Sequence, residues 1–322
     1  MKRNKTLKSL VGLAFSAGLL VSSAAFAQLV SVSSIVEHPA LDSVRDGIKQ
    51  ALADAGYTEE NGLKWQFQTA QGNTATAAQI ARKYVGDKSD VIVGISTPSA
   101  QAIVAATKSI PVVYSAVTDP VAAQLVPSWD PSNTNVAGVS DMLALEKQLE
   151  LIKTIVPEAK TVGMVYNPGE ANSVVVVERL RELLAANDMN LLEATAARTV
   201  DVGAAARSLV GKVDVIYTNT DNNVVSAFEA LVKVGNDSKI PIVASDTDSV
   251  ARGAIAALGI NYYDVGVQTG EMVVRILKGE KPGEMPSEFS EQLELFVNPG
   301  AAAKQGVTLD EEFIKTATKV IE

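Results

Sequence analysis

The chain has 322 residues, a net charge of −9 at neutral pH, one histidine and no cysteine. An acidic balance without a basic cluster disfavours binding to nucleic acid or to anionic lipid. The lack of cysteine excludes disulfides, thiol catalysis and a lipid-modified N-terminal cysteine. A chain of about 300 residues is typical of two packed lobes rather than of one compact core.

The first 27 residues have the order of a secretory signal peptide. Basic residues occur at positions 2, 3, 5 and 8, an apolar run covers residues 10–21, and the segment closes on Ala25-Phe26-Ala27, which predicts cleavage before Gln28. A transmembrane anchor is the alternative, but it needs about 20 apolar residues, and serines interrupt this run. We therefore predict a protein that is exported to the periplasm and is not tethered by lipid.

Short runs rich in Val and Ile alternate with amphipathic stretches along the rest of the chain, which predicts βαβ units and parallel sheets. We predict an α/β fold with two doubly wound parallel-sheet lobes. Strands are expected at residues 29–35, 63–69, 90–95 and 111–115, in a second series at 161–166, 190–196, 213–218, 241–244 and 254–258, and near the end at 291–297. Helices are expected at residues 41–55, 74–85, 99–107, 145–155, 172–186, 202–209, 223–234, 263–277 and 309–321.

Three segments are candidates for connections between the lobes. Residues 128–138 are rich in Pro, Ser and Asn and separate the two strand series. A second connection is expected at residues 258–261, and a third in the stretch 279–286, which contains Gly, Pro and charged residues. The predicted N-terminal lobe is residues 28–138 plus 260–282, and the predicted C-terminal lobe is residues 139–259 plus 283–322.

Polar side chains follow most of the predicted strands, at the sheet edge where open α/β folds bind ligands. Each could simply cap a helix, but runs such as residues 218–222 contain more polar side chains than one cap requires. We therefore predict a ligand site between the lobes that draws on Ser33, Glu37, His38, Ser96, Thr97, Pro98, Ala116, Val117, Thr118, Asp119, Tyr166, Asn167, Glu170, Asn172, Ser173, Asn219, Thr220, Asp221 and Asp246.

The charges of this candidate site favour an amino-acid zwitterion. Helix starts favour an anion such as a carboxylate, and the acids Asp119, Glu170, Asp221 and Asp246 can hold an ammonium group. No Lys or Arg lies in these loops, whereas a phosphate or dicarboxylate ligand would usually recruit Arg. Tyr166 and Tyr217 lie where they could flank an apolar or aromatic ligand side chain, although Tyr217 is better explained as an ordinary half-buried strand residue.

Sequence patterns of catalysis and of cofactor or metal binding are largely missing. There is no G-x-S-x-G, G-x-G-x-x-G, phosphate-binding Gly-Lys loop or H-E-x-x-H. We therefore predict a binding protein, not an enzyme, with no cofactor and no metal. Three alternatives stay open: a sugar-binding protein, a ligand-sensing periplasmic protein that docks on a membrane receptor, and a secreted hydrolase that uses a serine with His38.

Several segments together resemble the extracytoplasmic substrate-binding proteins of ABC importers, and in particular the subgroup with tryptophan- and phenylalanine-binding members. The resemblance covers the whole chain after the signal peptide. It rests on residues 36–42 (VEHPALD), 94–100 (GISTPSA), 118–121 (TDPV), 165–168 (VYNP), 253–264 with 277–279, and 297–302 (VNPGAA).

The resemblance implies the type I periplasmic binding fold, in which two lobes are joined by three crossovers. It also implies that the ligand carboxylate binds at Ser96, Thr97, Ala116 and Thr118, and that an acid of the second lobe, Asp246 or Asp221, binds the ammonium. The expected partners are a small amino-acid ligand and an inner-membrane ABC permease, with a monomer as the default state. Repressors that share this fold begin with a DNA-binding segment, and here the signal peptide takes its place.

Overall fold

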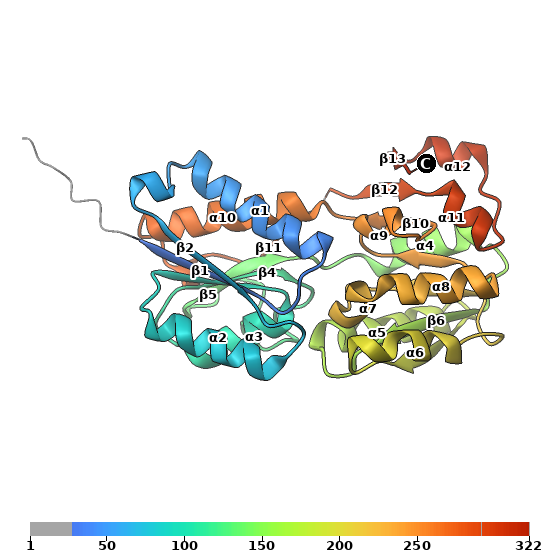
Figure 1. The fold of residues 1–322 in the computed structure, drawn as a ribbon, viewed down its shortest axis with the longest axis horizontal. Helices are drawn as coiled ribbons and strands as arrows, with labels where there is room; N and C mark the ends of the chain where they lie inside the picture. The colour runs from blue at the N-terminus through green and yellow to red at the C-terminus, as the bar shows by residue number, and fades with distance from the viewer. Residues whose placement is uncertain (1–27, 291, 322) are drawn as a thin grey trace, which may run out of the picture.

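The computed structural model describes residues 28–290 and 292–321, so the predicted signal peptide lies outside the described residues. Two α/β lobes lie side by side along the long axis of the molecule (Figure 1). Each lobe is a mostly parallel sheet with helices on both faces, which confirms the predicted fold class.

The first lobe is built mainly from the N-terminal part of the chain. Within the described residues its six strands lie in the order β11-β5-β4-β3-β1-β2, and all of them pair in parallel. Figure 1 shows α1 and α10 on one face of this sheet, with α2 and α3 on the other. The elements are β1 (Leu29–Ser34), α1 (Pro39–Asp54), β2 (Lys64–Thr69), α2 (Thr74–Gly86), β3 (Val91–Ile95), α3 (Thr97–Ala106), β4 (Val112–Val117), β5 (Val136–Ser140), α10 (Tyr262–Leu277) and β11 (Glu288–Phe289), with 3₁₀ turns at Glu59–Asn61 and Pro282–Glu284.

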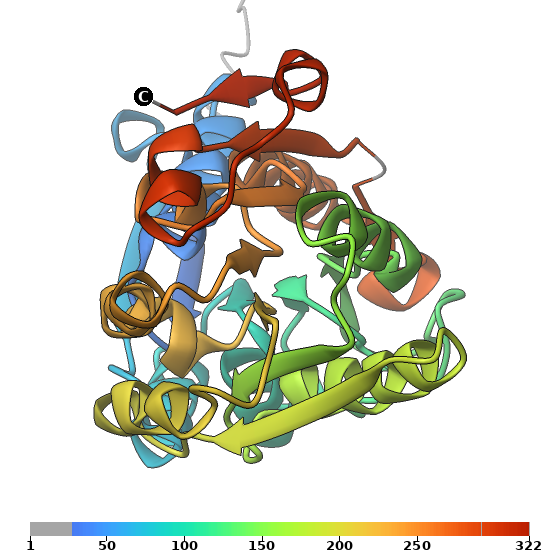
Figure 2. The same ribbon diagram turned by 90° about the vertical axis from the view of Figure 1, so that its right-hand side faces the viewer.

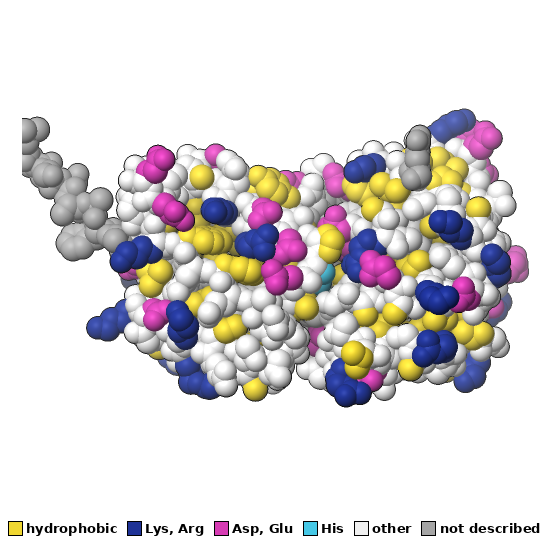
Figure 3. All heavy atoms as spheres, viewed as in Figure 1, with side chains coloured by type: hydrophobic (Ala, Val, Ile, Leu, Met, Phe, Trp, Pro, Cys, Tyr) yellow, Lys and Arg dark blue, Asp and Glu magenta, His cyan; other side chains and the backbone are white. Residues whose placement is uncertain are grey.

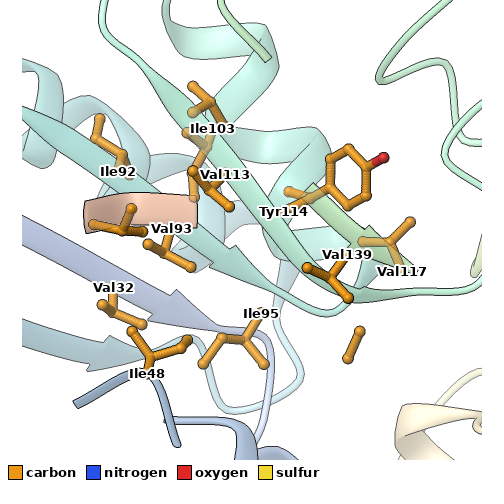
Figure 4. Close-up of a cluster of buried hydrophobic side chains, with 14 of the residues drawn as sticks. Val32, Ile48, Ile92, Val93, Ile95, Ile103, Val113, Tyr114, Val117 and Val139 are labelled. Atoms are coloured by element: carbon orange, nitrogen blue, oxygen red, sulfur yellow. The ribbon is translucent and has the colours of Figure 1, made fainter. Parts of the chain in front are cut away.

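The core of the first lobe lies on both faces of its central strands. Val32, Val93 and Val113 come from three neighbouring strands, while Ile48 of α1 and Ile103 of α3 cover opposite faces (Figure 4). Strands β3 and β4 are buried along their whole length. Strands that are covered on both faces consist mainly of hydrophobic residues, which is why these two strands read as continuous hydrophobic runs in the sequence. This packing holds the carboxyl ends of the strands in fixed positions at one edge of the lobe.

Helices α1 and α10 approach each other closely because small residues line their contact. A Cβ atom on Gly47 would collide with the Tyr263 carbonyl, and one on Gly266 would collide with the Val44 carbonyl. Glycine is therefore required at both positions to let the two backbones touch. The contact fixes the start of α10, which carries the buried Tyr262.

The second lobe has a seven-stranded sheet within the described residues, in the order β13-β12-β10-β9-β8-β6-β7. Strand β12 runs antiparallel to β10, and the other pairings are parallel. Viewed from this end of the molecule, helices flank both faces of the sheet (Figure 2). The elements are α4 (Leu145–Ile155), β6 (Thr161–Tyr166), α5 (Ala171–Ala185), β7 (Asn190–Thr195), a 3₁₀ turn at Thr199–Asp201, α6 (Val202–Ser208), β8 (Val215–Thr218), α7 (Asn222–Ser226), α8 (Phe228–Ser238), β9 (Ile242–Ala244), α9 (Asp248–Ala251), β10 (Ala256–Gly259), β12 (Glu294–Val297), α11 (Pro299–Lys304), α12 (Glu311–Lys315) and β13 (Lys319–Val320).

The chain passes between the lobes at residues 141–144, at residues 260–261 and between β11 and β12. The predicted boundaries at residues 138 and 282 therefore differ from the strand pairing, because β5 and β11 both belong to the first sheet. Residues 136–138 of the predicted linker 128–138 are in fact the first three residues of β5. A Cβ on Gly138 would collide with the backbone and ring of Tyr114, so a residue that reads as a linker signal in fact permits close strand pairing.

The C-terminal helix expected at residues 309–321 is wrong in its extent. Helix α12 ends at Lys315, and β13 follows it. The Thr318 backbone N–H donates to the Leu295 carbonyl, and β13 pairs with the exposed edge of β12. An unpaired strand edge offers a full row of hydrogen bonds, which here outweighs the amphipathic pattern.

The surface carries Lys, Arg, Asp and Glu side chains of both signs, with small hydrophobic groups between them (Figure 3). The view also shows the narrow waist at which the two lobes meet. None of the helices in residues 28–290 and 292–321 combines the length and apolarity that crossing a bilayer demands.

Candidate functional site

The carboxyl ends of strands from both sheets meet at the seam between the lobes. The Ser96 hydroxyl, directly after β3, donates to the side-chain carbonyl of Asn222 at 3.0 Å. The Arg179 guanidinium on α5 donates to the Asp119 carboxylate, which follows β4, at 2.6 Å. Both contacts join one lobe to the other, so the lobes are closed on each other at this seam.

A cavity of about 640 Å³, which we call the main cavity, opens at the seam. Its volume lies in the range of small-molecule binding sites. Thr118 of the first lobe, residues 141–146 and residues of the second lobe surround it. Its apolar wall includes Met142, Leu143, Leu145, Val175, Val176, Leu183 and Tyr217.

A second space of about 10 Å³, the small cavity, adjoins the main cavity through Thr118, Asp141 and Thr220, which line both. This volume holds about one water-sized group. Most of the residues that line it have polar side chains, and they come from both lobes. They include His38, Ser96, Asn172, Asp246 and Tyr262. The two spaces together have a polar end between strand ends and a wider apolar end.

The backbone at the polar end is strained. Ser96 has φ 71° and ψ 153°, and Ala116 has φ 52°, which L-residues rarely adopt. Ser96 directly follows β3, Ala116 is the second-last residue of β4, and both line the small cavity. Such strain persists where the surrounding structure enforces it, and it clusters at ligand sites.

Four buried polar atoms of cavity-lining residues lack a hydrogen-bond partner among the described residues. They are His38 Nδ1 and Asn172 Oδ1 at the small cavity, and Asn219 Oδ1 and Ser245 Oγ at the main cavity. Buried polar groups are normally paired. These atoms therefore offer free hydrogen-bonding capacity where a polar ligand would lie.

His38 is held in its neutral form. Burial, and then the positive charge of Arg252, lower the pKa of His38 to about 3. It precedes Pro39 at the start of α1, but its side chain makes no cap hydrogen bond. A neutral imidazole can present a lone pair or an N–H group to a ligand.

Glu170 and Asp221 hold the second lobe together beside the site. Asp221 accepts from the backbone N–H groups of Asn167, Asn223 and Val224 and from the Ser173 hydroxyl. Burial, and then the charge of Asp221, raise the pKa of Glu170 to about 7. Glu170 in turn accepts from the Asn222 backbone N–H and side-chain amide. This pair therefore positions Asn222, which contacts Ser96 of the first lobe.

The structure brings eight of the predicted site residues to the two cavities. They are His38, Ser96, Ala116, Thr118, Asn172, Asn219, Thr220 and Asp246. The following predicted residues line neither space: Ser33, Glu37, Thr97, Pro98, Val117, Asp119, Tyr166, Asn167, Glu170, Ser173 and Asp221.

The acids in the second group have structural partners. Asp119 binds Arg179 and also accepts from the backbone N–H groups of Val121 and Ala122. Asp221 caps α7, so the capping explanation applies to it and the expected ammonium role does not. Glu37 lies instead at an outer groove of the first lobe, beside Phe67 and Lys83.

Sequence reasoning missed several cavity residues. Asp141 and Met142 follow β5, which was not predicted. Val175, Arg179 and Glu182 lie on one face of α5, and their spacing of three to four residues was a readable signal of a shared helix face. Within the residues that the structure describes, no group of acidic or histidine side chains has the arrangement of a metal site.

A family model described as "ABC transporter substrate binding protein" matches residues 29–321. The chain belongs to this family. It is a solute-binding component of an ABC transporter, in a family of binding proteins rather than enzymes, and it acts outside the cytoplasm with the transporter as its partner. The resemblance seen in the sequence is thereby confirmed.

Relatives of this binding protein have known ligands or solved structures. A tyrosine-binding protein of Clostridioides difficile is 43% identical over 269 residues, covering 84% of this chain and 78% of the relative. A Vibrio cholerae protein of solved structure is 46% identical, with a TM-score of 0.90 over 92% of this chain and 100% of that one. A Streptococcus pneumoniae protein in complex with L-Trp is 34% identical, with a TM-score of 0.88 over 91% and 99% of the two chains.

The lobes of this binding protein are arranged as in a ligand-bound relative. A substrate-binding protein from Clostridium difficile, solved in a ligand-free, open form, is 39% identical over 92% of this chain and 99% of that one, yet its TM-score is only 0.69. The L-Trp complex is less similar in sequence but scores 0.88. The less similar sequence therefore has the more similar structure, which lobe closure explains and sequence identity does not. The contacts across the seam agree with a closed arrangement.

Proposed function

We propose that this binding protein captures an aromatic amino acid between its lobes and delivers it to its ABC permease. The observation that carries the proposal is the main cavity, whose apolar wall adjoins a polar end built from both lobes. An aromatic side chain suits the apolar wall, and the carboxylate and ammonium suit the polar end. The tyrosine-binding relative and the relative in complex with L-Trp support the same ligand class.

The proposal extends to the form in which the protein acts. A cleavable signal peptide would place residues 28–322 in the periplasm as a free monomer without a lipid anchor. The lobes would open and close about the three connections, and ligand contacts made only in the closed form would favour closure. The permease would recognise that closed form, as in a transport rather than a signalling role.

The proposal is tested by titration calorimetry on residues 28–322, refolded to remove any co-purified ligand. L-Tryptophan, L-tyrosine or L-phenylalanine should bind with a Kd of about 1 μM or tighter, equivalent to about −8 kcal/mol. L-Glutamate, L-lysine and D-glucose serve as controls and should give no heat of binding. Binding of the sugar without binding of any aromatic amino acid would overturn the proposal.

The Arg179–Asp119 contact should add to affinity because it forms across the closed seam. Arg179→Ala should weaken L-tryptophan binding about threefold to tenfold, since Asp119 is 5% exposed while Arg179 is half exposed and partly screened by solvent. Arg181→Ala is the matched control, because Arg181 lies on the same helix but pairs with Glu193 of its own lobe. Calorimetry that finds equal affinities for the two variants would exclude this role of Arg179.

A further inference from the structure

Asp141 occupies a central position at the seam. It is the first residue after β5, at the start of the first connection between the lobes, and its side chain is 5% exposed. It lines both the main cavity and the small cavity, so it lies where the polar and apolar ends of the site meet.

Only neutral groups bond to the Asp141 side chain. Oδ1 accepts from the Thr118 hydroxyl at 3.0 Å, and Oδ2 accepts from the Tyr262 hydroxyl at 2.9 Å. In the described part of the chain, no Lys or Arg forms an ion pair with it, and the nearby Arg179 pairs with Asp119. Each carboxylate oxygen can accept a further hydrogen bond, so Asp141 can take a positively charged donor.

The other acids at the site are less suited to a cation. Asp246 lines the small cavity but not the main cavity, and like Asp141 it accepts one hydrogen bond at each oxygen, here from the N–H and the hydroxyl of Ser249 at 2.9 and 2.7 Å. It differs from Asp141 in that the positive charge of Arg252 already acts on it. Glu146 and Glu182 line the main cavity but are exposed, where water weakens an ion pair.

We propose that the Asp141 carboxylate binds the α-ammonium group of the ligand. This assignment rests on the proposed function and names the acid that the sequence placed at Asp246 or Asp221. A buried carboxylate without a cationic partner is costly in free energy, and a ligand ammonium removes that cost. Consistent with this, burial raises the pKa of Asp141, although the hydrogen bonds from Tyr262 and Thr118 oppose the shift.

The position of Asp141 also links recognition to the connections between the lobes. Its partner Thr118 follows β4, and its partner Tyr262 begins α10 directly after the second connection. The ammonium would therefore bind a carboxylate that lies at the start of the first connection and is hydrogen-bonded to the residue that follows the second. An amino acid would be distinguished from a ligand of the same shape that lacks the charge.

The test compares two ligands on two proteins by titration calorimetry. L-Tryptophan and indole-3-propionate share the ring and the carboxylate, but only the first carries an ammonium group. Asp141→Asn should weaken L-tryptophan binding about 100-fold or more, equivalent to about 2.7 kcal/mol, and should change indole-3-propionate binding less than threefold. The control Asp264→Asn removes the same charge from an exposed residue of α10 and should leave both affinities within about twofold.

Each outcome separates the assignment from the proposed function. If wild-type protein binds no aromatic amino acid, the proposed function fails. If wild-type protein and Asp141→Asn bind L-tryptophan equally, only the assignment fails, and loss of binding in Asp246→Asn would then move the role to Asp246. Should Asp141→Asn not fold, Tyr262→Phe removes one hydrogen bond to the carboxylate. It should change L-tryptophan affinity about threefold or more and leave indole-3-propionate unchanged, and equal effects on both ligands would overturn the assignment.

Discussion

Val175→Trp should reduce the affinity for L-tryptophan about 100-fold, equivalent to about 2.7 kcal/mol. Val175 is half-buried on α5 and forms part of the apolar wall of the main cavity. The larger side chain would occupy the space in which the ligand ring should lie. Because Val175 is only partly packed against the core of the second lobe, the free energy of unfolding without ligand should change by about 1 kcal/mol or less.

Titration calorimetry and denaturant unfolding of the same samples check this result. Ala185→Trp provides the control, because Ala185 is the exposed last residue of the same helix and lines neither cavity. Its affinity should stay within about twofold of wild type. Undiminished binding by Val175→Trp would mean that the ligand ring lies elsewhere.

Replacing His38 with Gln should make the protein less sensitive to acid. The folded-state pKa of His38 is lowered to about 3, so between about pH 6.5 and pH 3 only the unfolded chain takes up this proton. Stability is therefore lost as the pH falls through this window, by about 1.4 kcal/mol for each unit below 6.5. At pH 5 the wild type should have lost about 2 kcal/mol that His38→Gln does not lose.

The measurement is urea unfolding of both proteins without ligand at pH 7.5 and pH 5. Glu170 acts in the opposite direction, because a pKa raised to about 7 makes the folded state gain stability as the pH falls from 7 toward 4.5. Both proteins keep Glu170, so its contribution cancels in the comparison. An equal change in unfolding free energy for the two proteins would show that His38 titrates normally in the folded state.

Much of the fold could be predicted because its central elements follow simple patterns. The run Val112–Val117 is buried along its whole length and reads as a strand from composition alone. Strand β5 does not, since Gly138 and the preceding polar residues resemble a linker. Its pairing depends on contact with Tyr114, a residue far from it in sequence, and no local pattern encodes such a contact.

The candidate site was predictable only in part for the same reason. Strand ends located His38, Ser96 and Thr118 at the seam, because parallel strands present their carboxyl ends at one edge. The position of an acid after a strand does not show whether that acid caps a helix or binds a ligand. Asp221 and Asp141 both follow strands, but Asp221 caps α7 and lines neither cavity, whereas Asp141 lines both.

The most direct test of lobe closure around an aromatic amino acid is a crystal structure of residues 28–322 grown with L-tryptophan. We expect the indole ring in the main cavity against Val175 and Tyr217, the ammonium at Asp141, and the Ser96–Asn222 and Arg179–Asp119 contacts in place. L-Tryptophan bound outside the seam, or bound there with the lobes apart, would contradict the account.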